Sequence, residues 1–199
     1  MDEIWKEIED IATENGGFIK TSQIEKIGIS RQKIKKYVDE GALEVIKKGL
    51  YAIANDVPDE YVKIQMQSTK VIFSYGAALF LWDMSDRVPH QIDVTVPQGT
   101  NMTRIKNRNE NLRFHYVTKD LYEVGITQTT SPQGGTVWLY DKERCICDLI
   151  RDKEKTEMQL YSQAIKEYFK GKPNYRKLLK YGKMFDIEDK IRTYMEVLT

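Results

Sequence analysis

The sequence predicts an α+β protein with an N-terminal winged helix-turn-helix, followed by a mixed domain that combines a small sheet with several helices. Three observations indicate this fold class. Short amphipathic helical patterns near the N-terminus are separated by glycines, two strand-like runs then flank a basic turn, and strand-like and helical patterns alternate from residue 61 onward. We expect a winged helix-turn-helix domain at residues 1–54, a linker at 55–60 and a second domain at 61–199.

The composition is that of a folded protein that can bury a core. The chain has 199 residues, of which 41% are hydrophobic and 31% are charged, and this balance is typical of globular domains. No apolar stretch approaches the roughly 20 residues that span a bilayer. The acidic N-terminus lacks the basic and apolar regions of a signal peptide. We therefore expect a cytoplasmic protein with no membrane partner.

The two cysteines, Cys145 and Cys147, are one residue apart in a segment with a helical pattern. This spacing disfavours a disulfide between them, so we expect two reduced, partly buried thiols. A zinc site would need two further ligands, and the only histidines, His90 and His115, stand far away in no ligand spacing. The sequence therefore predicts no metal site and no cofactor.

Two helices are predicted before the segment that carries most of the basic residues. The first spans residues 2–15, where isoleucines three or four positions apart form one apolar side, and the Asn-Gly-Gly run at 15–17 ends it. The second is very short. Its start is predicted from the capping-box pattern Ser22-x-x-Glu25, and Gly28 breaks it.

A third helix is predicted from Arg31 to Glu40, with Ser30 as its N-cap. At about 100° per residue, the apolar residues at positions 34, 37 and 38 share one side, and Gln32 and Lys36 lie opposite. Arg31 stands in the first turn, where recognition helices meet base edges. Its guanidinium can bond guanine O6 and N7, and the Gln32 amide can bond adenine N6 and N7.

The next segment has the pattern of a wing. Strand-like runs at residues 42–46 and 50–53 flank Lys47, Lys48 and Gly49, which form a natural hairpin tip. Lysines at such a tip can contact the phosphates that flank the minor groove. The residues that we expect to contact DNA are Ser30, Arg31, Gln32, Lys33, Lys35, Lys36, Lys47 and Lys48.

The charge pattern supports this interpretation locally but not globally. The net charge is only +1, whereas residues 16–53 carry eight basic and four acidic residues beside an acidic first helix. Two alternatives stay open: the basic helix is only a solvated surface, or the winged helix binds a protein. The combination of N-cap, glycine turn, basic helix face and basic hairpin tip favours double-stranded DNA as the partner.

The second domain is predicted to be mixed, with most of its helices near the C-terminus. Helices are expected at 61–69 and 76–84, from residue 142, and in three segments after residue 157; strands are expected at 71–73, 91–96, 112–117 and 136–140. We expect the strands at 91–96 and 112–117 to pair with each other.

The sequence contains no recognisable catalytic motif, and we expect a non-enzymatic protein with no catalytic residues. Asp83, Asp86 and Asp93 form a loose carboxylate group near a predicted strand, and paired acids can bind Mg²⁺ in nucleic-acid enzymes. Helix ends and solvent-facing strand positions explain these residues more simply. A Mg-dependent nucleic-acid enzyme remains an alternative. His115 is expected to be half-buried and structural.

A second basic surface is predicted in the segment after the 91–96 strand. It comprises Arg104, Lys106, Arg108 and Arg113, with Glu110 as the one opposing charge. Two interpretations stay open. The segment is either a solvated loop or a functional surface. A functional surface would make a second contact with nucleic acid or serve an RNA-related effect of the toxin.

The stretch from Lys26 to Ile53 closely resembles the N-terminal domain of AbiEi-type antitoxins. The family pattern has Ser-Arg at the start of a recognition helix, a Gly-x-Leu turn and a basic wing that ends in Gly-x-Tyr. In this chain these elements are Ser30-Arg31, residues 41–43 and residues 49–51. Many regulators share this pattern, so it is moderately specific by itself.

Two later regions are similar to the same family. Residues 73–101 match its small-residue helix, its Asp-Arg-x-Pro link and its strand ending in Thr-Val-Pro-x-Gly. Residues 137–152 match a later strand, an Asp-x-Glu-Arg turn and an Asp-Leu-Ile helix. Together the three regions cover most of residues 20–152, whereas the C-terminal helices match more weakly.

The resemblance implies an antitoxin and transcriptional autorepressor from a toxin–antitoxin operon of abortive infection, a form of phage defence. Such proteins bind inverted or direct repeats in their own promoter. The implied protein partner is a nucleotidyltransferase-like toxin, which is counteracted without a stable complex. Direct blockade of the toxin by protein–protein contact is the alternative.

Overall fold

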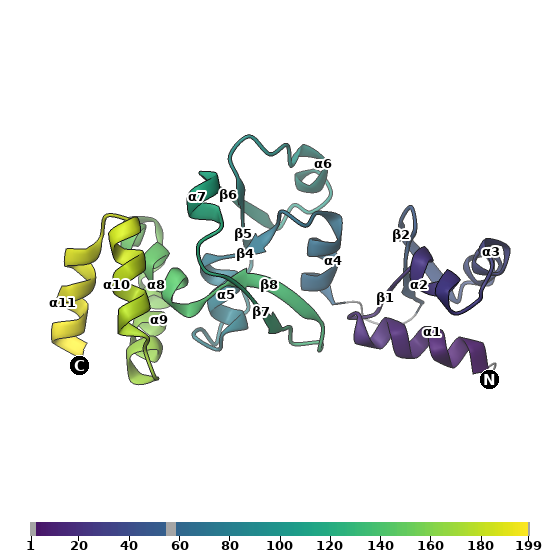
Figure 1. Ribbon diagram of the computed structural model, residues 1–199, viewed down its shortest axis with the longest axis horizontal. Helices are drawn as coiled ribbons and strands as arrows, with labels where there is room; N and C mark the ends of the chain where they lie inside the picture. Colours follow the sequence, from purple (N-terminus) through teal and green to yellow (C-terminus); the bar gives the residue numbers. More distant parts are fainter. Residues whose placement is uncertain (1–2, 55–58, 199) are drawn as a thin grey trace. The chain divides into compact units, whose positions relative to one another are not determined.

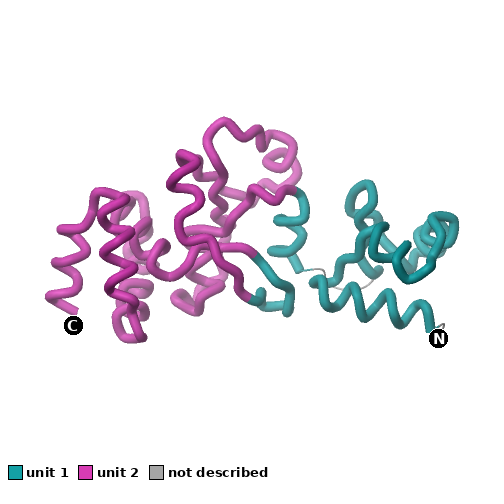
Figure 2. The backbone as a smooth tube through the Cα atoms, viewed as in Figure 1, with its two compact units in different colours: residues 1–67, 130–137 teal, residues 68–129, 138–199 magenta. Residues whose placement is uncertain are grey.

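The computed structural model describes residues 3–54 and 59–198 and has the α+β fold that the sequence predicts (Figure 1). The chain forms two compact units (Figure 2). The first unit comprises residues 1–67 and 130–137, and the second comprises residues 68–129 and 138–199. Each unit has its own sheet and is described separately.

The first unit contains the helix-turn-helix and the wing. Its elements are α1 (Glu3–Glu14), β1 (Phe18–Lys20), α2 (Thr21–Lys26), α3 (Arg31–Asp39), β2 (Leu43–Lys47), β3 (Leu50–Ile53) and α4 (Glu60–Gln67). The strands form an antiparallel sheet in the order β1-β3-β2. Gly49 closes the β2–β3 hairpin with φ of 78°, a left-handed conformation that favours glycine. The predicted wing is therefore confirmed as a hairpin.

One apolar cluster joins α1, α2 and α3 to the three-stranded sheet of the first unit. Ile8 of α1, Ile24 of α2 and Ile34 of α3 are all buried in it. Each of these residues lies on the apolar side of its helix, so the pattern that predicted the helices also supplies the core. Burying branched side chains of this size contributes about 1.5–3 kcal/mol each.

The start of α2 differs from the prediction. The helix begins at Thr21, and the backbone N–H of Lys20 donates to the side-chain oxygen of Gln23 at 2.9 Å. The expected capping box between Ser22 and Glu25 is therefore wrong by two positions. The sequence analysis also predicts no strand at residues 18–20, which pair with β3 as β1.

The helix α4 begins within the segment expected to be a linker. Asp59 is buried, and its carboxylate accepts the backbone N–H groups of Tyr61 (2.9 Å) and Val62 (3.2 Å), as an N-cap does. The Ser131 hydroxyl, from the segment 130–137, donates to the same carboxylate. Residues 55–58 of the expected linker lie outside the described residues. The proposed division at residues 55–60 stays a prediction, whereas the first compact unit also includes α4 and residues 130–137.

The second unit combines a mixed sheet with a group of helices. Its elements are β4 (Ile72–Phe73), α5 (Tyr75–Leu81), β5 (Ile92–Pro97), α6 (Thr103–Lys106), β6 (Leu112–Val117), α7 (Lys119–Tyr122), β7 (Ile126–Thr130), β8 (Thr136–Tyr140), α8 (Lys142–Arg151), the 3₁₀ helix η1 (Lys153–Lys155), α9 (Met158–Lys170), α10 (Tyr175–Met184) and α11 (Glu188–Leu198). The ends of β7 and β8 reach into the segment 130–137 of the first unit.

The sheet of the second unit has the order β6-β5-β4-β8-β7. The strands β5 and β6 pair in parallel along their whole length, from Ile92 opposite Leu112 to Pro97 opposite Val117, so the expected pairing of these two segments is confirmed. The helix α5 packs on β5 and α8, and α8 to α11 lie together beside the sheet (Figure 1). The sequence did not predict α6, α7 or β7, which are short.

A buried arginine organises the centre of the second unit. The side chain of Arg144 on α8 is 1% exposed, and its Nε donates to Asp148 Oδ2 at 2.9 Å. One of its terminal nitrogens donates to the carbonyl oxygen of Val124 at 3.0 Å. The guanidinium also lies over the rings of Tyr140 and Phe185, at 4.1 and 4.4 Å from their centroids. The charge is thus paired, hydrogen-bonded and enclosed by aromatic faces.

Both cysteines are free and buried within α8, as the sequence predicts, and burial raises the pKa of each thiol. In the part of the chain that the structure describes, no helix is long and apolar enough to cross a membrane.

Replacing Arg144 by methionine should lower the free energy of unfolding by about 3–5 kcal/mol, because it leaves the Asp148 carboxylate buried without its main partner. Arg176 on α10 is exposed and supplies the control, since Arg176→Met should change stability by less than about 0.5 kcal/mol. Denaturant unfolding monitored by circular dichroism measures both. Equal stability of the two variants would contradict this account.

Candidate nucleic-acid interface

The start of α3 is set by a turn and a cap. Gly28 adopts φ of 82° after α2, which a residue without a Cβ does at no steric cost. Ser30 then has extended backbone angles, and its hydroxyl oxygen accepts the backbone N–H of Lys33 at 3.3 Å. The predicted N-cap is therefore confirmed. It fixes the position at which the first turn of α3, with Arg31, begins.

One side of α3 is anchored in the core of the first unit. Ile34 is 2% exposed and Tyr37 is 9% exposed. The Tyr37 ring packs against the indole of Trp5 on α1, with 5.1 Å between ring centroids. In the described residues, the Tyr37 hydroxyl is buried without a hydrogen-bond partner. Tyr37 therefore contributes through its ring, and its hydroxyl is an uncompensated polar group.

The opposite side of α3 is open and basic. Arg31, Gln32, Lys35 and Lys36 are all exposed, whereas Lys33 is half-buried with its ammonium 5.8 Å from the centre of the Tyr37 ring. Lys36 lies 3.5 Å from the Glu40 carboxylate one turn later. The helix thus presents amide and cationic side chains on the side that faces away from Ile34 and Tyr37.

Arg31 is held by an acidic residue that the sequence analysis placed in another role. Its Nε lies 2.7 Å from Glu25 Oε1 on α2, and the Arg31 side chain is 80% exposed. The hydrogen bond to Glu25 raises the pKa of Arg31. Glu25 binds Nε, and the two terminal nitrogens have no partner among the described residues. These are the atoms that a bidentate contact uses. The spacing of six residues across a glycine turn gives no simple signal for this pair.

The two wing lysines are placed differently. Lys48 is exposed at the hairpin tip, whereas Lys47 is half-buried and its ammonium donates to the backbone carbonyl oxygen of Met66 in the last turn of α4. Lysine commonly satisfies carbonyl groups at a helix C-terminus in this way. The alternation of residues along the wing could not show that Lys47 has a partner outside the hairpin.

The four residues of the expected second basic surface differ in their elements and partners. Arg104, Lys106 and Arg108 are exposed in or just after α6. Arg113 instead lies on β6, where its guanidinium contacts the buried carboxylate of Asp93 at 2.5 and 2.9 Å. Arg113 is thus paired with Asp93 although its side chain is 52% exposed, and the second basic surface of four residues stays a prediction.

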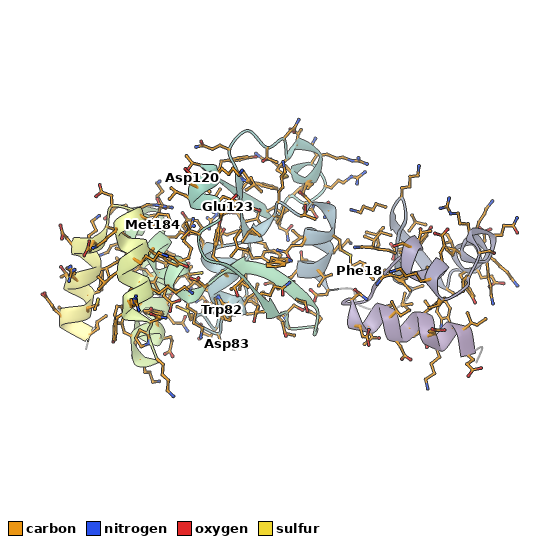
Figure 3. The ribbon with its side chains drawn as sticks, viewed as in Figure 1. Phe18, Trp82, Asp83, Asp120, Glu123 and Met184 are labelled. Atoms are coloured by element: carbon orange, nitrogen blue, oxygen red, sulfur yellow. The ribbon has the colours of Figure 1, made fainter. Side chains whose placement is uncertain are left out.

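The carboxylates considered for a magnesium site do not converge. Asp83 follows Trp82 at the end of α5, where Figure 3 labels both, and its side chain is exposed. Asp93 is 1% exposed and is occupied by Arg113 and His115. Among the described residues, no group of three or more histidine, cysteine, aspartate or glutamate side chains is placed to hold a metal ion. His115 is partly buried, as expected.

The arrangement of the first unit has the dimensions of a duplex-binding module. A helix about 10–12 Å wide with its side chains fits the major groove, which is about 12 Å wide. The exposed side chains of the first turn, Arg31 and Gln32, carry the donors and acceptors that read base edges. Lys35, Lys36 and Lys48 carry ammonium groups suited to phosphates.

Comparison with known protein families gives a match that covers the first unit only. Residues 6–54, which run from α1 to the end of the wing, match the family model described as "Transcriptional regulator, AbiEi antitoxin". No curated protein matches the chain.

One similar solved structure is described as "Crystal structure of RV2827C protein from Mycobacterium tuberculosis". The sequences are 10% identical, the match covers 92% of this chain and 72% of that chain, and the TM-score is 0.58. At this identity the likeness concerns the fold alone.

Removing the hydroxyl of Tyr37 should stabilise the first unit. We expect Tyr37→Phe to raise the free energy of unfolding by about 1 kcal/mol, because the buried hydroxyl has no partner. Tyr37→Ala should lower it by about 3–5 kcal/mol, since the ring itself fills the core between α3 and α1. Thermal unfolding of the three proteins tests this pair. A loss of stability in the phenylalanine variant would mean that the hydroxyl has a partner.

Proposed function

We propose that this chain represses its own toxin–antitoxin operon by inserting α3 into the major groove of promoter DNA. The match of residues 6–54 to the family model described as "Transcriptional regulator, AbiEi antitoxin" supports this proposal. The observation that carries the proposal is the two-sided nature of α3. Ile34 and Tyr37 fix one side in the core, and the other side offers amide and cationic groups to solvent.

The exposed residues divide by chemistry into base contacts and phosphate contacts. Arg31 would contact guanine through its two terminal nitrogens while Glu25 holds its Nε, and Gln32 would contact adenine. Lys35, Lys36 and Lys48 would bind phosphates, which positions the module without reading sequence.

Three further residues of the proposed interface have secondary roles. Lys33 is half-buried against Tyr37 and would contribute a phosphate contact at the edge of the helix. Lys47 would have to leave the Met66 carbonyl oxygen to reach DNA, so we rank it below Lys48. Ser30 acts first as the N-cap of α3, and a DNA contact by its hydroxyl would be additional.

The sites on the promoter are proposed to be inverted or direct repeats. A single recognition helix and wing contact only a few base pairs, and each correct base pair contributes about 1–3 kcal/mol. Two copies on repeated sites would therefore reach the specificity that a cytoplasmic regulator needs among many competing sites. The exposed residues Arg104, Lys106 and Arg108 are proposed as a second basic surface for nucleic acid.

The partner in the operon is proposed to be a nucleotidyltransferase-like toxin that the chain counteracts without a stable complex. Support comes from the family model that matches residues 6–54. Size-exclusion chromatography after co-expression tests the absence of a complex, and we expect the two proteins to elute separately. Co-elution would favour direct blockade of the toxin instead.

Arg31→Ala should weaken binding to the cognate promoter site by about 1–3 kcal/mol and should reduce discrimination between cognate and random DNA. The physical reason is the loss of a bidentate base contact, which random sites do not offer. Fluorescence anisotropy with two duplexes of equal length measures both affinities. Glu25→Gln is the companion variant: it keeps Arg31 but removes the charged partner of its Nε, and we expect a smaller loss of discrimination.

The outcome that contradicts this role is specific. If Arg31→Ala weakens binding to the cognate and the random duplex by the same factor, Arg31 contacts only phosphate and the assignment of base reading to the start of α3 is wrong.

Lys48→Ala should weaken binding to all DNA sequences alike and should make the dependence of log K on log salt concentration shallower by about 1, because one phosphate contact is lost. Lys6 on α1 is exposed and is the matched control, since Lys6→Ala removes the same charge outside the proposed interface. Salt titrations of DNA binding by the unaltered protein, Lys48→Ala and Lys6→Ala test whether the wing contacts phosphate.

The same titration extends to the second basic surface. A variant with alanine at Arg104, Lys106 and Arg108 should also reduce the slope if this surface contacts the same DNA.

For the wing itself, an unchanged slope in Lys48→Ala would show that the wing does not contact phosphate.

A further inference from the structure

The second unit contains a cavity that DNA binding by the first unit does not use. Its volume is about 920 Å³, which lies in the range of pockets that hold small molecules. Its walls come from the start of α5, from β5 and β6, from the end of α8 and from η1 with the residues that follow it. Every lining residue belongs to the second unit.

A buried carboxylate organises one wall of the cavity. Asp93 on β5 is 1% exposed, and its Oδ1 lies 2.7 Å from the Nε2 of His115 on the neighbouring strand β6. Arg113, two positions earlier on β6, binds both carboxylate oxygens. Burial alone would raise the pKa of Asp93, but the hydrogen bonds from His115 and Arg113 lower it, so the carboxylate stays ionised. The parallel register of β5 and β6 brings these side chains together.

A second carboxylate, that of Asp152, binds three other side chains that line the cavity. Asp152 Oδ2 accepts the hydroxyl of Tyr75 at 2.7 Å, and Asp152 Oδ1 accepts the Lys155 ammonium at 3.1 Å. Arg151 also binds Asp152 Oδ2, at 3.0 Å. Burial alone would raise the pKa of Asp152, but the hydrogen bonds from Tyr75, Lys155 and Arg151 lower it to about 2.

An aromatic pair lies between these two clusters. The rings of Tyr75 and His115 stack with 4.2 Å between centroids and 26° between planes. Tyr75 has φ of 43°, a left-handed conformation that is strained for a residue with a Cβ. Its hydroxyl bonds to Asp152 and Arg151 hold it there. Gly76 comes next, and a Cβ at that position would lie 3.2 Å from the Asp93 carboxylate.

On the side of the cavity around Asp93 and Asp152, the hydrogen-bonding capacity left over consists mainly of donors. Every oxygen of Asp93 and Asp152 already accepts at least one hydrogen bond. In contrast, the described residues provide no partner for the Nη1 of Arg113, and the Lys155 ammonium has two hydrogens beyond its bond to Asp152. A ligand that complements this wall is rich in acceptors and carries negative charge.

From these observations we propose that the cavity binds a nucleoside monophosphate. Arg113 and Lys155 would contact the phosphate, because their unused N–H groups are charged donors, and phosphate is the acceptor that arginine and lysine bind best. The Tyr75–His115 pair would provide the aromatic surface for the base, since nucleic-acid bases stack favourably on aromatic side chains. The volume of about 920 Å³ is sufficient for such a ligand.

Isothermal titration calorimetry on the full chain tests the proposal with three separate probes: AMP, adenosine and inorganic phosphate. We expect AMP to bind at micromolar to millimolar concentration and each of the other two to bind at least about tenfold more weakly, because each offers only part of the complementarity. GMP, CMP and UMP then test the preference for a base. No heat of binding with any of the four nucleotides at millimolar concentration would overturn the proposal.

Variants at exposed positions locate the site without disturbing the fold. The Lys155 side chain is 82% exposed, and Lys155→Ala should weaken AMP binding by about tenfold, the effect of one lost charge-assisted hydrogen bond. Arg113→Lys keeps a cation beside Asp93 but loses the forked donor geometry, and we expect a loss of similar size. Lys166 on α9 is exposed and outside the cavity lining, so Lys166→Ala is the matched control and should bind AMP as the unaltered protein does.

The other outcomes decide between parts of the proposal. Equal affinity for AMP and inorganic phosphate would refute the role of the aromatic pair, and equal affinity for AMP and adenosine would refute the phosphate site. Equal weakening by Lys155→Ala and Lys166→Ala would place binding outside the cavity. Promoter affinity of the same variants is measured in parallel, so failure of the nucleotide site and failure of DNA recognition by α3 are distinguishable.

Discussion

The exposed surface of the first unit depends on the contacts that fix α3 in its core. Ile34 and the ring of Tyr37 bury one side of the helix against α1 and the sheet, and this burial determines which side chains can face solvent. A helix with basic residues on every side would have no apolar side to pack against the core, so its orientation would not be fixed. Because the apolar side is anchored, Arg31 and Gln32 have a fixed relation to the wing, and the basic residues act as one surface.

The second unit places charge in its interior, and each buried charge there has a partner. Arg144 is enclosed by Asp148 and two aromatic rings, and Asp93 is enclosed by Arg113 and His115. The two cases differ in consequence. The Arg144 pair is sealed and stabilises the arrangement of α8. The Asp93 cluster opens onto a cavity, so the groups that hold the carboxylate also remain available to a ligand.

Much of the first unit could be predicted from sequence because its signals are local. The N-cap at Ser30, the turn at Gly28 and the hairpin at Gly49 are each encoded within a few residues. The pairing of Glu25 with Arg31 and the contact of Lys47 with Met66 could not be predicted, because both join segments from different elements. The cavity was missed for the same reason: His115 was expected to be structural, and its partners lie on β5 and α5, far away in sequence. The sequence groups Asp93 with Asp83 and Asp86, but no group of three or more such side chains in the described residues is placed to hold a metal ion.

The proposed regulator role depends on one physical claim, that the exposed side of α3 reads base pairs in a promoter. Footprinting of the full chain on the DNA directly upstream of its own gene tests this claim most directly. The account predicts protection of short repeated segments, with contacts to guanine N7 in the major groove at each repeat. Protection that is uniform along the fragment, at the same protein concentration that covers unrelated DNA, would contradict it.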